Sequence, residues 1–75
     1  MHNKMPLLVV KLQSLPENLI DKEELQRVIL RTTGVVSASA LRSYLLSLIA
    51  HNVIAWDELT YKYIINKETN YSNTP

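Results

Sequence analysis

The sequence predicts a small α+β domain, and two observations carry this prediction. The middle of the chain has two stretches in which apolar residues recur with helical spacing, separated by Gly34, the one glycine. The stretch that follows holds two short runs of β-branched and aromatic residues, which are typical of strands. A chain of 75 residues has room for one compact domain. We place that domain at residues 1–69 and expect 70–75 to be a disordered polar tail.

Residues 7–12 predict a first strand. This segment is rich in branched residues and begins to alternate at its end, so we expect Leu8, Val10 and Leu12 on its buried face. Pro16 then interrupts the chain. An isolated hairpin would be marginally stable, so we expect this strand to pair with the two C-terminal strands in a small antiparallel sheet.

A first helix is predicted from Lys22 to Thr33. Asp21 and Glu24 form a capping-box pair at its start, and Leu25, Val28 and Ile29 supply its apolar stripe. Gly34 stands where a left-handed residue ends a helix.

A second helix follows, with Ser37 or Ser39 as its cap and Asn52 at its end. Its predicted inner face consists of Leu41, Tyr44, Leu45, Leu48 and Ile49.

Residues 53–56 and 59–65 predict two strands joined through Asp57 and Glu58. In the second strand we expect one buried face, made of Leu59, Tyr61, Tyr63 and Ile65. For Trp56 we favour packing in the core or across the hairpin, and the alternative is stacking on a base or filling a partner's pocket.

Composition excludes several classes of function. Without cysteine there is no disulfide and no thiolate metal site, and the two histidines are far apart in sequence, so we expect no metal and no cofactor. Nothing pairs a nucleophile with an oriented base, and one glycine cannot build a phosphate-cradling loop, so we expect no catalytic residues and no enzyme. No apolar run reaches membrane-spanning length and no signal-peptide pattern is present, so we expect an intracellular protein.

The centre of the chain carries a resemblance. Thr33-Gly34, the run from Val36 to Leu45, Leu48, and Asn52-Val53-Ile54 resemble the core of winged helix-turn-helix proteins. The resemblance implies a winged helix-turn-helix with a short N-terminal strand and a C-terminal two-stranded wing. It also implies that the helix at 37–52 enters the major groove of double-stranded DNA.

The resemblance implies a set of DNA-binding residues. On the second helix the outward residues are Ser37, Ser39, Arg42, Ser43 and Ser47. Arg31 and Thr33, beside the turn, are candidate phosphate contacts. Residues 27–67 have a net charge of +3, from five Lys or Arg against Asp57 and Glu58. Those two acids would be repelled by phosphates, so we expect the wing to stay off the DNA.

The predicted function is therefore a small transcriptional regulator of the kind found in archaea, bacteria and their viruses. We expect it in the cytoplasm, either at the nucleoid or in a viral host cell. We also expect a homodimer without membrane contact, because Leu30, Leu46 and Trp56 are left over from the inner faces. The alternative is a winged-helix adaptor that binds protein and no DNA.

Overall fold

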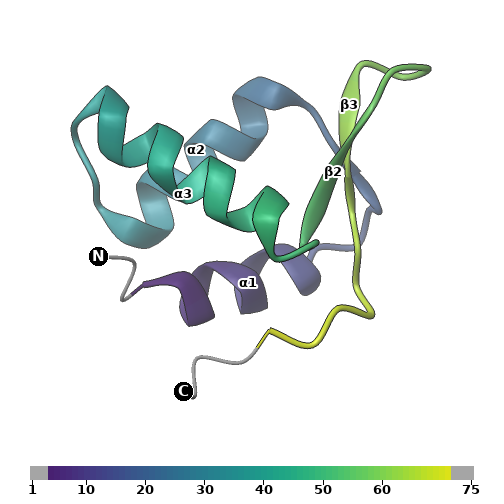
Figure 1. Cartoon of the computed structure of the whole chain (residues 1–75), viewed down its shortest axis with the longest axis horizontal. Helices are drawn as coiled ribbons and strands as arrows, with labels where there is room; N and C mark the ends of the chain where they lie inside the picture. Colours follow the sequence, from purple (N-terminus) through teal and green to yellow (C-terminus); the bar gives the residue numbers. More distant parts are fainter. Residues whose placement is uncertain (1–3, 72–75) are drawn as a thin grey trace.

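The computed structural model describes residues 4–71, and these form three helices and one three-stranded antiparallel sheet (Figure 1). The order along the chain is α1 (Met5–Gln13), β1 (Leu19–Ile20), α2 (Lys22–Thr33), α3 (Ala38–Ala50), β2 (Ile54–Asp57) and β3 (Lys62–Ile65). The sheet order is β1-β3-β2. The predicted α+β class is confirmed.

The predicted strand at 7–12 is wrong, because this segment lies inside helix α1. Pro6 is in the first helical turn, where its fixed φ favours a helix and its missing N–H costs nothing. Met5, Leu8, Val9 and Leu12 are all buried, and this 3-1-3 spacing fits one face of a helix. Val10, expected on the buried face of a strand, is 66% exposed. Helical spacing thus outweighs the strand preference of the branched residues.

The third strand of the sheet comes from another segment. Leu19 and Ile20 form β1, which pairs with β3 so that Leu19 faces Ile64 and Ile20 faces Tyr63. A two-residue strand is too short to show alternation, so the sequence pattern had no signal for it.

The two central helices form as predicted. Asp21 accepts a hydrogen bond from the backbone N–H of Glu24 at 2.8 Å, and Gly34 ends α2 with a left-handed φ of 73°. Ser37 caps α3 by accepting from the N–H of Ala40 at 3.1 Å. Across the four-residue break the chain direction turns by 105° between α2 and α3.

The core contains side chains from every element, and α1 runs beneath the α2–α3 pair (Figure 1). Of the predicted inner face of α3, Tyr44 and Leu48 are buried, Leu41 and Leu45 are partly buried, and Ile49 is exposed. The buried apolar residues are Met5, Leu8, Val9, Leu12, Ile20, Leu25, Val28, Ile29, Tyr44, Leu48, Val53, Ile54, Tyr63 and Ile65.

Both strands of the hairpin start later than the pattern predicted, β2 at Ile54 and β3 at Lys62, and β3 ends at Ile65 as expected. Residues 58–61 form the turn, and the N–H of Tyr61 donates to the carbonyl of Asp57 at 2.9 Å. Leu59 and Tyr61 were predicted to be buried in a strand, which is wrong: they are 92% and 74% exposed. Trp56 packs across the hairpin as expected, edge-on to Tyr63 with ring centroids 4.9 Å apart.

After β3 the chain returns along α1. Gln13 donates from its side-chain amide to the carbonyls of Asn66 and Thr69, and Lys67 donates to the carbonyl of Leu15. Tyr71 contacts His51 edge-on with ring centroids 5.0 Å apart. Residues 72–75 of the predicted tail lie outside the described residues.

Within residues 4–71, no single helix is both long and apolar enough to cross a membrane. Only α2 and α3 taken together reach that length and composition, as a pair bent by 105°.

A pair of alanine substitutions tests the helical assignment of α1. Leu12→Ala should lower the free energy of unfolding by about 2–5 kcal/mol, because Leu12 is fully buried. Val10→Ala should change it by less than about 0.5 kcal/mol, because Val10 is largely exposed. Urea denaturation measures both, and similar large losses at the two positions would instead support a strand.

A second test concerns the turn after α2. Gly34→Ala should cost about 1–2 kcal/mol, since an L side chain is strained at a φ of 73° although nothing lies within 4 Å of the added Cβ. Gly34→Asn should cost less, because Asn tolerates the left-handed region. Equal losses for the two variants in urea denaturation would contradict this explanation.

Candidate nucleic-acid interface

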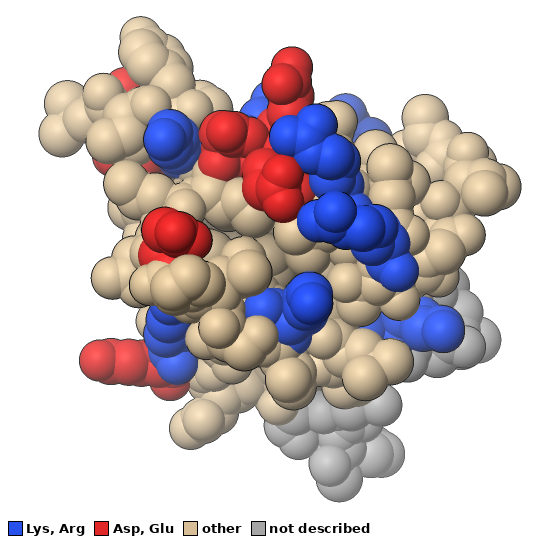
Figure 2. All heavy atoms as spheres, turned by 180° about the vertical axis from the view of Figure 1, so that it is seen from behind, with Lys and Arg blue, Asp and Glu red and all other residues tan. Residues whose placement is uncertain are grey.

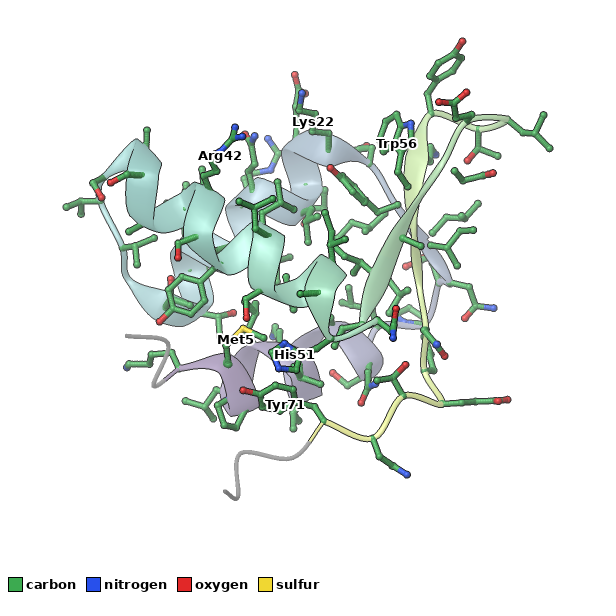
Figure 3. The ribbon with its side chains drawn as sticks, viewed as in Figure 1. Met5, Lys22, Arg42, His51, Trp56 and Tyr71 are labelled. Atoms are coloured by element: carbon green, nitrogen blue, oxygen red, sulfur yellow. The ribbon has the colours of Figure 1, made fainter. Side chains whose placement is uncertain are left out.

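The first half of α3 presents the candidate interface. Because Tyr44 and Leu48 point into the core, helical geometry turns Ser39 and Arg42 outward, and both are exposed. Figure 3 shows Arg42 projecting from α3 toward the edge of the molecule that also carries Lys22 and Trp56. Both ion pairs among residues 4–71 involve Glu24, so Arg42 takes part in neither.

The serines of α3 differ in what they can offer a ligand. Ser37 is engaged as the helix cap, and its hydroxyl lies 3.5 Å from that of the exposed Ser39. Ser43 is half-buried on the flank of the helix. Ser47 lies one turn further on, where its hydroxyl is 3.5 Å from Nδ1 of His51. Only Ser39 and Ser43 therefore share the first two turns with Arg42.

The two candidate phosphate contacts on α2 are not brought to this face. Arg31 lies 3.3 Å from Glu24 and lines a groove with α1 residues. Thr33 donates its hydroxyl proton to the carbonyl of Ile29 at 2.7 Å and accepts from the N–H of Val35 at 3.4 Å. The hydroxyl of Thr33 thus stabilises the helix end and the turn.

Lys22 is a residue that the sequence reasoning missed. It begins α2, is exposed, and projects to the same edge as Arg42 (Figure 3). The resemblance to helix-turn-helix proteins offered a signal for it, because in those proteins the helix before the recognition helix crosses the DNA backbone. Lys22 at the start of α2 and Arg42 on α3 therefore lie at the same edge of the molecule.

The second half of α3 has a different character. Leu46 is 51% exposed, and Ile49 and Ala50 are exposed as well. Arg42 is the one charged residue of the helix. The outward surface of α3 is therefore polar at its start and apolar toward its end.

Charge on the opposite side of the molecule is mixed rather than uniformly basic. In Figure 2, which views the structure from behind, acidic and basic side chains lie next to each other over α2. Glu24 illustrates this mixture, because its two carboxylate oxygens lie 3.0 Å from Arg27 and 3.3 Å from Arg31. Around Glu24 the positive charge of Arg27 and Arg31 is therefore partly neutralised.

The hairpin turn keeps a negative charge. Asp57 accepts hydrogen bonds from the Thr60 hydroxyl at 2.6 Å and from the Leu59 N–H at 3.4 Å. The Thr60 hydroxyl is the main cause that holds the pKa of Asp57 below its usual 3.8; desolvation opposes it, and backbone N–H groups add to it. Asp57 therefore stays ionised at neutral pH and would be repelled by a phosphate.

Among the described residues, no three His, Cys, Asp or Glu side chains are grouped as metal ligands would be.

No family model, no curated protein and no solved structure matches this chain.

The lowered pKa of Asp57 predicts a pH dependence of stability. A depressed folded-state pKa contributes stability that is present above pH 3.8 and is lost as the pH falls through the folded value. The difference in unfolding free energy between the wild type and Asp57→Asn should therefore shrink below pH 3.8. Urea denaturation between pH 2 and 7 checks this, and a difference that stays constant over that range would contradict it.

Proposed function

We propose that this protein is a winged helix-turn-helix that binds double-stranded DNA through the first half of α3. The observation that carries the proposal is the 105° turn between α2 and α3 across four residues that include Gly34. Helix-turn-helix motifs have an angle of about 90–120° and a turn of 3–4 residues.

The element order supports the same proposal. A hairpin, β2 and β3, follows the second helix of the pair directly and corresponds to the wing. β1 adds a third strand on the far side of β3, so the wing is attached to the body of the domain and not isolated. β1 takes the place in the sheet that was expected for residues 7–12, and α1 precedes it.

In the proposed complex the start of α3 enters the major groove. Arg42 lies one turn from the start of the helix, and its guanidinium can donate two hydrogen bonds to a guanine or pair with a phosphate. Ser39 and Ser43 add neutral contacts on the same turns. Lys22, on the same edge as Arg42, contacts the phosphate backbone. The acidic turn of the hairpin remains away from the DNA.

The second candidate function is a protein-binding adaptor with the same fold. The exposed Leu46, Ile49 and Ala50 favour it, since an apolar helix surface is typical of a protein interface. A transcriptional role and a cytoplasmic location would follow from DNA binding and fail with it.

Arg42→Ala tests DNA binding most directly. It should weaken specific binding by about 1–3 kcal/mol, the magnitude of a lost base contact. Its unfolding free energy should change by less than about 0.5 kcal/mol, because Arg42 is exposed. Fluorescence anisotropy with duplexes selected from a random library, across a salt series, gives the affinity and the number of phosphate contacts.

Arg27→Ala is the matched control. It removes the same charge from α2, where Arg27 pairs with Glu24 at 3.0 Å, and it should affect DNA affinity less than Arg42→Ala does. Equal effects would point to net charge alone. Absence of any salt-dependent DNA binding by the wild type would favour the adaptor.

A further inference from the structure

The turn of the hairpin, residues 58–61, is the first of two apolar features that neither the core nor the proposed DNA surface uses. We name it the wing tip. Leu59 is 92% exposed and Tyr61 is 74% exposed, and Tyr61 adopts a left-handed φ of 56°. A bulky residue in this conformation is strained. Glu58 and the adjacent Asp57 give the wing tip a negative charge.

The second feature is a groove of about 460 Å³ between α1 and α2. We name it the α1–α2 groove; its lining residues are Leu7, Val10, Lys11, Ser14, Arg31 and Thr32. Leu7 is 59% exposed, although it lies on a helix with one charged residue, Lys11. A helix that is apolar on both faces is typically buried on both. The volume of the groove falls in the range of about 300–1,000 Å³ that is typical of pockets for small molecules. A groove of this size has room for two side chains.

The groove is positively charged. Lys11 and Arg31 line it, and no acidic side chain does. Glu24 is shared by Arg27 and Arg31, so one carboxylate faces two guanidinium groups. The wall of the groove therefore retains excess positive charge, opposite in sign to that of the wing tip.

We propose that the wing tip of one copy of this chain docks into the α1–α2 groove of a second copy. Leu59 and Tyr61 would fill the apolar floor made by Leu7 and Val10. Glu58 would pair with Lys11 or Arg31. The hairpin extends away from the body and α1 lies across the opposite side of the fold, so a wing tip cannot reach the groove of its own chain (Figure 1).

Charge decides between this arrangement and two others. A symmetric contact of one α1–α2 groove with another would place Lys11 and Arg31 of both copies at one interface, where like charges repel. Insertion of the wing tip into DNA would place Asp57 and Glu58 among phosphates. The head-to-tail contact joins opposite charges, and because it is heterologous it adds copies in one direction.

The proposal predicts association that depends on concentration and salt. Sedimentation velocity of the full chain from 5 µM to 1 mM should show dimers and larger species. High salt should shift them toward monomer, since it screens exposed charge pairs. Leu59→Ser should weaken association at least tenfold, and so should Leu7→Ser combined with Val10→Ser. All three positions are exposed, so circular dichroism and urea denaturation should show intact folds.

Mixing the two defective variants gives the decisive test. The Leu59→Ser chain keeps an intact groove and the Leu7→Ser, Val10→Ser chain keeps an intact wing tip. An equimolar mixture should therefore form a one-to-one dimer and nothing larger. In a symmetric contact between two grooves, this mixture would form no such dimer.

Two further variants complete the test. Leu46→Ser removes an exposed apolar side chain from α3 and should leave association unchanged. Glu58→Lys should weaken association, and Lys11→Glu on the partner chain should restore it. A wild type that is monomeric at 1 mM, a mixture that forms no dimer, or equal loss with Leu46→Ser would each overturn the proposal.

Discussion

The left-handed turn at Gly34 is the constraint on which the rest of the structure depends. It ends α2, and the chain then turns by 105° before Ser37 caps α3. Thr33 reinforces the turn by bonding the carbonyl of Ile29 and the N–H of Val35. This direction lets α3 bury Tyr44 and Leu48 while Arg42 faces outward. A change in the turn would therefore alter the core and the candidate interface together, because one helix serves both.

The parts of the fold that the sequence predicted are those with local causes. The ends of α2 follow from Asp21 and Gly34, each of which satisfies backbone groups within a few residues. The segment of α1 was predicted as a strand because Val9 and Val10 favour strands. The apolar spacing from Met5 to Leu12 is helical, but it stabilises a helix only through contacts with the rest of the core. β1 exists only through its pairing with β3, so no local pattern could reveal it.

The candidate site was predictable to a similar extent. Helical spacing placed Arg42 outward, but it could not show that Thr33 and Ser37 use their hydroxyls for the turn and the helix cap. Short polar side chains beside a helix end compete for backbone groups, and this competition removes them from a binding surface. Arg31 does not belong to the candidate interface, for another reason. Glu24, seven residues earlier on α2, lies 3.3 Å from it, and packing of α1 sets the groove that Arg31 lines.

The hairpin turn shows how one carboxylate can shape both structure and surface. Asp57 bonds Thr60 and the N–H of Leu59, and these bonds place the turn at residues 58–61 where the apolar pattern had indicated strand. Two apolar residues that could have added to a small core are therefore exposed, and Tyr61 is strained by about 1–2 kcal/mol. A small domain has little stability to lose. The proposed contact with a second copy would account for a turn that gives up burial and adds strain, because the negative charge of the turn is opposite to that of the α1–α2 groove.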